Sequence, residues 1–291
     1  MTKRALVPVG IAEPSERVEV YAELPNSFEE IGFFVPRYMG PIADLEATRR
    51  MPQLEIVQLL TAGYDHALSR IPPGVSLHNA GPLHTTSTAE LALALTLAKL
   101  RRIDDFARSD GTWLSGRYDS LADKRVVVIG AGEIGTRICE LVEAFQGIAI
   151  SVARTARGNV HGVDALNELL PTADVVIVVV PLNDTTRGMV NDDFLRAMKD
   201  GALLVNVARG PVADTEAITR HADRLRFALD VTDPEPLPAD HPLWQQRSVL
   251  ISPHVGGNTS AFIPRARRLV HDQLQRWFDG RPLMYGVDET T

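Results

Sequence analysis

The sequence predicts an α/β fold with doubly wound parallel sheets, and three observations lead to this fold class. Residues 125–139, RVVVIGAGEIGTRIC, run from an apolar strand through a glycine turn into a helical pattern. Short apolar segments alternate with helical ones along the whole chain, which is typical of α/β proteins. Most of the apolar segments are continuous runs, as expected of parallel strands that are buried on both faces.

The glycine turn matches a dinucleotide-binding fingerprint in its required context of strand, turn and helix. Gly130 permits the tight turn, Gly132 lets the backbone approach a pyrophosphate, and Gly135 lets the helix pack close to the strand. The helix begins near Glu133 and Ile134, and its N-terminus presents unpaired N–H groups and a positive dipole end. We therefore expect these five positions to bind the phosphates of a dinucleotide.

The remaining elements follow from the same reasoning. Strands are expected at residues 5–9, 56–59, 75–78, 126–129, 148–152, 175–180, 203–206, 227–231 and 249–251. Helices are expected at residues 88–109, 133–145, 165–170, 192–198, 214–221 and 258–278. The strand–helix units after residue 120 suffice for one nucleotide domain, and the last helix could cross back to a smaller first domain. We predict a substrate domain of residues 1–95 plus 265–291 and a dinucleotide-binding domain of residues 96–264.

Composition excludes several classes of protein. The chain has 291 residues, 45% of them hydrophobic and 23% charged, which is ordinary for a globular protein. The net charge of −7 and the absence of a basic block argue against nucleic acid or an anionic membrane as a partner. Cys139 is the one cysteine, so we expect no disulfide and no metal site. No signal peptide or membrane-spanning run is apparent, and a cytoplasmic protein is predicted.

The residues after the second strand of the nucleotide domain bear on the choice of cofactor. NAD-binding domains usually place Asp or Glu there, about 20 residues beyond the glycines, to bind the ribose hydroxyls. Here the strand runs into Ala153, Arg154, Thr155, Ala156 and Arg157, with no acid. An arginine pairs with a 2′-phosphate through charge-assisted hydrogen bonds. NADP(H) is therefore favoured over NAD(H), and the alternative is that the two arginines are solvated loop charges.

Three later strand ends carry residues that could handle a carboxylate and a proton. Arg209 follows one strand, acids including Glu235 follow the next, and His254 follows the last. Catalytic groups of open α/β sheets lie at the carboxyl ends of strands. An imidazolium can donate the proton that reduction of a keto group requires, and a neighbouring carboxylate would orient it. Each residue taken alone has a structural alternative, such as an arginine in a surface ion pair.

These segments together carry a family resemblance. They are TAGYDHA (61–67), TAEL (88–91), VVVIGAGEIG (126–135), VVPLNDTTRGMVN (179–191), NVARGPVADTEAI (206–218), ALDVTDPEPLPADHPLW (228–244) and SPHVGGNT (252–259). The chain resembles the D-isomer-specific 2-hydroxyacid dehydrogenases over nearly its whole length. The resemblance implies two Rossmann-like or flavodoxin-like domains with a cleft between them, and a homodimer.

The resemblance also implies roles. Arg209 would hold the substrate and polarise its keto oxygen, His254 would act as the acid and base, and Glu235 would pair with His254 and keep its pKa high. Asp230 would position the nicotinamide carboxamide. The substrate carboxylate would be bound by the backbone around Ala62, Gly63 and Tyr64, and the cofactor also by Thr155, Pro181, Thr186, Val207, Ala208, Gly256 and Gly257. A neighbouring histidine, His84, is interpreted as a residue of a surface loop.

Two departures from the family pattern stand out. The Ala153-Arg154-Thr155 run replaces the acid of NAD-using relatives, as it does in NADP-preferring relatives that reduce glyoxylate and hydroxypyruvate. Gln146 stands where the family commonly has Gly, and we interpret it as a neutral packing change. The leading hypothesis is an NADP(H)-preferring reductase of small 2-keto acids. The alternatives are a phosphite or other family dehydrogenase, and a non-catalytic NAD(P)-sensing protein on the same fold.

Overall fold

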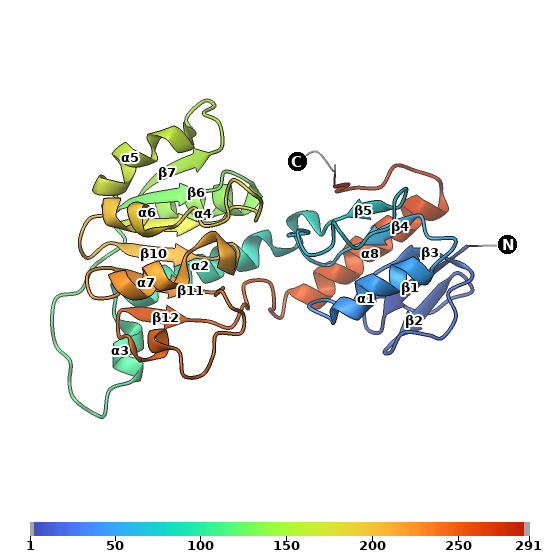
Figure 1. Cartoon of the computed structure of the whole chain (residues 1–291), viewed down its shortest axis with the longest axis horizontal. Coiled ribbons are helices and arrows are strands. Elements are labelled where there is room, and N and C mark those ends of the chain that lie inside the picture. Colours follow the sequence, from blue (N-terminus) through green and yellow to red (C-terminus); the bar gives the residue numbers. More distant parts are fainter. Residues whose placement is uncertain (1–2, 288–291) are drawn as a thin grey trace. The chain divides into compact units, whose positions relative to one another are not determined.

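The computed structural model describes residues 3–287 and divides into two compact units (Figure 1). Unit 1 contains the chain up to His84 and from Thr259 onward, and unit 2 contains the segment from Thr85 to Asn258. The predicted domain boundaries, at 95/96 and 264/265, lie later in the chain than these unit boundaries. The first difference arises because the helix that begins at Thr85 packs against the strands and helices of unit 2.

Unit 1 is a five-stranded parallel sheet with the strand order β2-β1-β3-β4-β5. Its strands are β1 (Arg4–Pro8), β2 (Val18–Tyr21), β3 (Ile31–Phe34), β4 (Ile56–Gln58) and β5 (Ser76–His78). Its helices are α1 (Ile42–Glu46), α8 (Phe262–Phe278) and the 3-10 turns η1 (Ala47–Arg50) and η2 (Gly81–His84). This strand order is the flavodoxin-like arrangement.

Alternate side chains of each strand in unit 1 point to opposite faces of the sheet. Both faces are buried, because other elements of the unit pack on each of them. Ala5 and Val7 of β1 pack in one cluster with Val270 of α8, whereas Leu6 packs in another with Ala47 of η1. The strands β2 and β3 and the helix α1 are short and were not predicted from the sequence. Gly32 interrupts the apolar run of β3, and a Cβ there would lie 2.8 Å from Trp277 of α8. The missing side chain therefore lets α8 approach the sheet.

Unit 2 is a seven-stranded parallel sheet with the order β12-β11-β10-β9-β6-β7-β8. Its strands are β6 (Arg125–Ile129), β7 (Ile148–Ala153), β8 (His161–Gly162), β9 (Val175–Val178), β10 (Leu203–Asn206), β11 (Arg226–Leu229) and β12 (Val249–Ile251). Its helices are α2 (Thr85–Leu100), α3 (Ile103–Ala107), α4 (Glu133–Ala144), α5 (Leu166–Leu169), α6 (Asp192–Ala197) and α7 (Thr215–His221). Its 3-10 turns are η3 (Val163–Ala165), η4 (Leu170–Thr172), η5 (Gly210–Val212) and η6 (Pro242–Gln245).

Helices cover both faces of this second sheet, so the predicted doubly wound α/β class is confirmed. Val127 of β6 packs with Leu195 of α6, while its neighbour Val128 packs with Leu93 of α2 and Ile138 of α4. Burial of each such side chain stabilises the fold by roughly 1.5–3 kcal/mol. Because both faces are dry, the strands are the continuous apolar runs from which they were predicted.

The helix predicted over residues 88–109 is two helices, α2 and α3. The chain turns at Arg102, whose φ of 55° lies in the left-handed region and interrupts the helical path. Lys99 and Asp104 flank the turn and form a buried ion pair with an Nζ–Oδ2 distance of 2.9 Å. Lys99 Nζ also donates to the carbonyl oxygen of Arg247, which fixes the turn to the loop before β12.

Gln146 ends α4 in a conformation that favours glycine. Its φ is 63°, its N–H donates to Glu143 O, and the N–H of Gly147 donates to Val142 O. This is the bonding pattern of a Schellman C-cap, in which a left-handed residue follows the helix. The interpretation of Gln146 as a neutral packing change is therefore wrong, because a side chain at this φ is strained.

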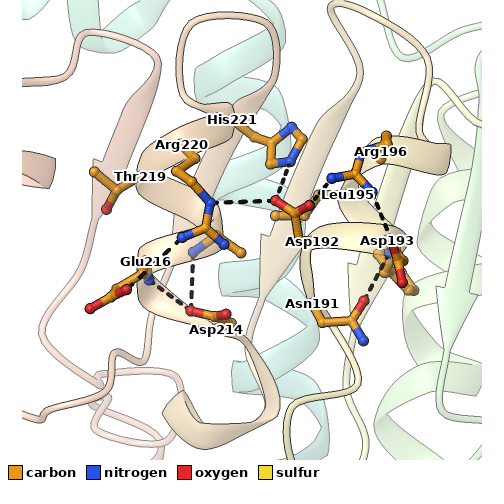
Figure 2. A network of polar contacts seen from close by, with 12 residues as sticks. Asn191, Asp192, Asp193, Leu195, Arg196, Asp214, Glu216, Thr219, Arg220 and His221 are labelled. Carbon is orange, nitrogen blue, oxygen red and sulfur yellow. Dashed lines mark hydrogen bonds and ion pairs between the residues drawn. The ribbon is translucent and has the colours of Figure 1, made fainter.

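A polar network joins α6 to α7 on one face of the unit 2 sheet (Figure 2). The Asp192 carboxylate accepts hydrogen bonds from His221 Nε2 at 3.0 Å, from Arg220 Nε at 3.4 Å, and from Arg196. Arg224 Nε donates to His221 Nδ1, so Nδ1 is an acceptor and the ring proton lies on Nε2. These charged groups thus add polar contacts between α6 and α7 to the apolar packing of the same two helices.

Candidate active site

The predicted site residues of unit 2 follow the carboxyl ends of its strands. The strand order reverses between β6 and β9, which are neighbours in the sheet. Ligands of open α/β sheets bind at such a switch point. The glycine turn follows β6 and Pro181 follows β9, so both flank this point. Strand β7 leads away from it on one side, whereas β10, β11 and β12 lead away on the other.

The three glycines of the turn meet different surroundings. Gly130 has a φ of 120°, and a Cβ there would lie 2.3 Å from Val179 O. A Cβ on Gly135 would lie 1.7 Å from Gly130 O, so the start of α4 touches the turn directly. A Cβ on Gly132 would meet nothing within 4 Å. Two of the glycines are thus required by the protein's own backbone, whereas Gly132 leaves open space at the helix start.

The start of α4 fits a phosphate group. Gly132 is the N-cap and supplies no side-chain hydrogen bond to the first turn, which contains Glu133, Ile134 and Gly135. The first N–H groups of a helix have no partner within the helix, and together with the dipole they attract an anion. The open space beside Gly132 and these N–H groups form a cradle that a pyrophosphate would fill. The residues present therefore fit a dinucleotide.

The residues after β7 follow the strand that pairs with β6 on the side away from β9. Arg154 and Thr155 are exposed, and Arg154 has no hydrogen bond or ion pair with any residue from 3 to 287. Arg157 Nη2 donates to Ala131 O at 3.1 Å, and its backbone exchanges two hydrogen bonds with Val160. Arg157 therefore reaches the glycine turn from a tight hairpin. This contact was not predicted from the sequence, because its partners are 26 residues apart in the chain.

The loops after β9 and β10 hold further predicted residues. Thr186 Oγ1 donates to Pro181 O at 2.6 Å, so these two residues lie together. Val207 and Ala208 are buried, and Val207 N donates to Val178 O at 3.1 Å. The loop after β10 is thereby held against the end of β9, next to the switch point.

Arg209 comes next and is half-buried at the start of η5. Its Nη1 donates to Ala208 O at 2.7 Å. A Cβ on the following Gly210 would lie 1.9 Å from Thr232 O, so the backbone after β10 touches the backbone after β11. This close approach places the Arg209 guanidinium near enough to Glu235 for its charge to act on that carboxylate.

Glu235 and His254 form the pair that the sequence predicted. His254 Nδ1 lies 2.6 Å from Glu235 Oε1, and the two side chains are 28% and 39% exposed respectively. Burial opposes ionisation of Glu235, but the hydrogen bond and charge of His254, a backbone hydrogen bond from Thr232 and the charge of Arg209 outweigh it and lower the pKa of the carboxyl group. An ionised Glu235 can only accept, so Nδ1 carries a proton and Nε2 is the nitrogen left to exchange one.

Asp230 lies beneath the loop that carries His254 and is 3% exposed. Its carboxylate accepts hydrogen bonds from that loop, including one from Gly256 N at 2.9 Å. Gly257 follows and is half-buried. The sequence analysis also missed Ser252, whose hydroxyl donates to Asp230. A serine before a proline gave no signal of its own.

The residues predicted for the substrate carboxylate belong to unit 1 and follow β4. The carbonyl groups of this loop are engaged, since Ala80 N donates to Thr61 O, Asn79 Nδ2 to Ala62 O and Thr61 Oγ1 to Gly63 O. The N–H groups of Ala62, Gly63 and Tyr64 donate to no residue within the described part of the chain. Consecutive unengaged N–H groups suit an anion.

His84 is not a residue of a surface loop. It is 5% exposed, its Nε2 bonds to Leu60 O at 2.7 Å, and its ring stacks on Phe262 at a centroid distance of 5.7 Å. Tyr38 stacks on the same two rings. The histidine is buried because the aromatic rings cover it and the carbonyl of Leu60 satisfies its N–H.

Among residues 3–287, no group of three or more His, Cys, Asp and Glu side chains is arranged to hold a metal ion. No helix among the same residues has the length and apolar character needed to cross a membrane.

Comparisons with known proteins bear on the same segments. The family described as "D-isomer specific 2-hydroxyacid dehydrogenase, NAD binding domain" matches residues 91–256. A glyoxylate reductase of Aeropyrum pernix is 30% identical over 261 residues, which cover 82% of this chain and 77% of that protein. A glyoxylate/hydroxypyruvate reductase A of Arabidopsis thaliana is 31% identical over 258 residues, which cover 84% of this chain and 82% of that protein.

Solved structures show the same fold. The crystal structure of a D-isomer specific 2-hydroxyacid dehydrogenase from Xanthobacter autotrophicus, in complex with NADPH and MES, superposes with a TM-score of 0.81. It is 28% identical in sequence, and the match covers 95% of this chain and 92% of that one. This chain thus has the fold of a structurally characterised D-isomer specific 2-hydroxyacid dehydrogenase.

Proposed function

Because the chain belongs to the D-isomer-specific 2-hydroxyacid dehydrogenase family, we propose that it reduces small 2-keto acids of the glyoxylate or hydroxypyruvate class and prefers NADPH. The chain is an enzyme that uses a nicotinamide cofactor on 2-hydroxy or 2-keto acids. The observation that carries the proposed reduction chemistry is the His254–Glu235 pair, whose carboxylate lies within the influence of the Arg209 charge.

The cofactor would be held by the loops that flank the switch point. The glycine turn and the first N–H groups of α4 would bind its pyrophosphate. The loops of Pro181–Thr186 and Val207–Ala208, with Gly256 and Gly257, would lie along its nicotinamide half, because they follow strands on that side of the sheet. When bound, the cofactor supplies the hydride.

The preference for NADPH rests on the end of β7. No acid stands there to repel a 2′-phosphate, and the exposed Arg154 is not engaged by any residue from 3 to 287. A guanidinium in this state can take up phosphate oxygens without first breaking an ion pair. Thr155 adds a hydroxyl beside it.

His254 would donate the proton in reduction and accept it in oxidation. Its Nδ1 is occupied by Glu235, so the exchange takes place at Nε2. The ionised Glu235 orients the ring and stabilises the imidazolium, which is the form that donates.

Arg209 would bind the substrate and polarise its keto oxygen. A guanidinium offers several donors in one plane, so it can fork onto a carboxylate or stabilise negative charge that develops on a carbonyl oxygen. The unengaged N–H groups of Ala62, Gly63 and Tyr64 support a role for this loop in binding the substrate carboxylate.

The proposal also includes a homodimer. Light scattering would test it by measuring the mass of the protein in solution.

The proposal is tested by following oxidation of NADPH and NADH in parallel. The keto acids are glyoxylate, hydroxypyruvate, pyruvate and phenylpyruvate. We expect NADPH-dependent turnover of glyoxylate or hydroxypyruvate, and a loss of turnover by orders of magnitude in His254→Ala with cofactor binding retained. Near-normal turnover of that variant would refute the role of His254. No turnover with either cofactor, in a protein that binds NADPH, would favour phosphite or a sensing role instead.

A further inference from the structure

The carboxylate of Asp230 is buried and heavily engaged by one short loop. Its Oδ1 accepts from Ser252 Oγ at 2.6 Å and from Val255 N at 2.9 Å, and its Oδ2 accepts from Gly256 N at 2.9 Å. The backbone adds a further bond, from His254 N to Asp230 O at 2.8 Å. Hydrogen bonds to an ionised acceptor are about twice as strong as neutral ones. Residues on both sides of His254 are therefore tied to a single side chain.

His254 needs such ties, because its backbone is strained. Its φ is 52°, which lies in the left-handed region. This conformation raises the free energy of any residue that has a Cβ. Strained residues persist where their surroundings over-determine them. Here Ser252 precedes His254, Val255 and Gly256 follow it, and Asp230 bonds to all three of those neighbours. A Cβ on Gly256 would lie 3.1 Å from Asp230 Oδ2, so the loop sits tightly on the carboxylate.

The bonding bears on what Asp230 does. An ionised carboxylate has about four acceptor sites, and three of those on Asp230 are taken by the loop. We propose that Asp230 and Ser252 are positioning residues that hold His254 in its left-handed conformation and thereby aim the imidazole at Glu235 on one side and at the reacting oxygen on the other. This inference rests on the proposed function, because it takes His254 to be the acid and base. It assigns to Asp230 a role in addition to contact with the nicotinamide carboxamide.

Ser252→Ala is the main test, because it removes one hydroxyl and leaves the charge of Asp230 in place. We expect kcat to fall about tenfold, as loss of one charge-assisted bond implies, while the Kd for NADPH stays within about twofold. Ser248→Ala is the matched control. Ser248 precedes the first residue of β12, and its Oγ donates to Ala222 O. Removal of this hydroxyl should leave kcat unchanged.

The second readout does not depend on turnover. The proton between His254 Nδ1 and Glu235 gives a downfield NMR signal, which His254→Gln identifies by its loss. We expect this signal to shift or broaden in Ser252→Ala and to vanish in Asp230→Asn, whose kcat falls about 100-fold. Asparagine has the same shape, but its NH₂ group cannot accept from Gly256 N.

The outcomes separate the two proposals. If Asp230→Asn and Ser252→Ala weaken NADPH binding and leave the His254 signal unchanged, Asp230 is a cofactor contact and the positioning role is overturned. If the wild-type protein reduces no keto acid, the proposed function fails, but the NMR signals of the variants still decide whether Asp230 and Ser252 hold His254.

Discussion

Gly132→Ala separates the stability of the glycine turn from its use by a ligand. A Cβ at Gly132 meets no atom within 4 Å, and its φ of −85° and ψ of −169° are open to alanine. The methyl group stiffens the unfolded chain, which stabilises the protein by about 0.4–1 kcal/mol. Alanine is a markedly poorer N-cap than glycine, which offsets this gain by a similar amount. The free energy of unfolding should therefore change by less than about 1 kcal/mol.

The affinity for the dinucleotide should change much more. The methyl group would occupy the space through which a pyrophosphate reaches the N–H groups of α4. Overpacking of this kind costs about 1–3 kcal/mol, which is a rise in Kd of about 5- to 150-fold. Calorimetric titration with NADPH measures the affinity, and urea unfolding of the free protein measures the stability.

Two variants serve as controls for Gly132→Ala. In Gly135→Ala the new Cβ would lie 1.7 Å from Gly130 O, so the free protein itself should lose stability by about 1–3 kcal/mol or more. Gly116→Ala lies in an exposed loop before β6, where the nearest atom to a Cβ would be Tyr118 Oη at 3.3 Å, and it controls for a glycine-to-alanine substitution outside the glycine turn. If Gly132→Ala binds NADPH within twofold of the wild type, the pyrophosphate does not approach this backbone and the reasoning is wrong.

Three further predictions concern the cofactor, the acid–base pair and the helix cap. Arg154→Ala should raise the KM for NADPH about tenfold or more and leave the KM for NADH unchanged. An equal rise in KM for both cofactors would mean that Arg154 has a structural role. The pKa of Glu235 is lower in the folded protein than in the unfolded chain, where it is about 4.3. Its ionised form therefore stabilises the fold at pH values above about 4.3, and this contribution is lost as the pH falls through the folded-state pKa. Urea unfolding should show the difference between the wild type and Glu235→Gln shrinking from about pH 5 to pH 3, and a constant difference would contradict it. Gln146→Gly should stabilise the protein by about 0.5–1 kcal/mol in thermal unfolding, because relief of the left-handed strain exceeds the entropy cost of glycine, and a lower melting temperature would contradict this.

Much of unit 2 was predictable from local patterns. The strands at 203–206 and 249–251 have the bounds that their apolar runs predicted. Such runs are readable because both faces of a parallel sheet exclude water. In unit 1 the same signal was weak, since β2 is an edge strand with the charged Glu19 and β3 is interrupted by Gly32. Those strands are stabilised by what packs on them, which a local window does not contain.

The sequence by itself determined the fold class, the glycine turn and the choice of Glu235 as the partner of His254, because each depends on residue types at strand ends. The tertiary structure alone decided that Gln146 and His254 have left-handed backbones, that Arg157 reaches Ala131, and that Asp230 holds the loop of His254. These features join residues that lie 22 to 26 positions apart or depend on a single φ. The long-range contacts arise from the order of strands in the sheet, which sets which loops meet, whereas the left-handed φ of Gln146 belongs to the cap of α4.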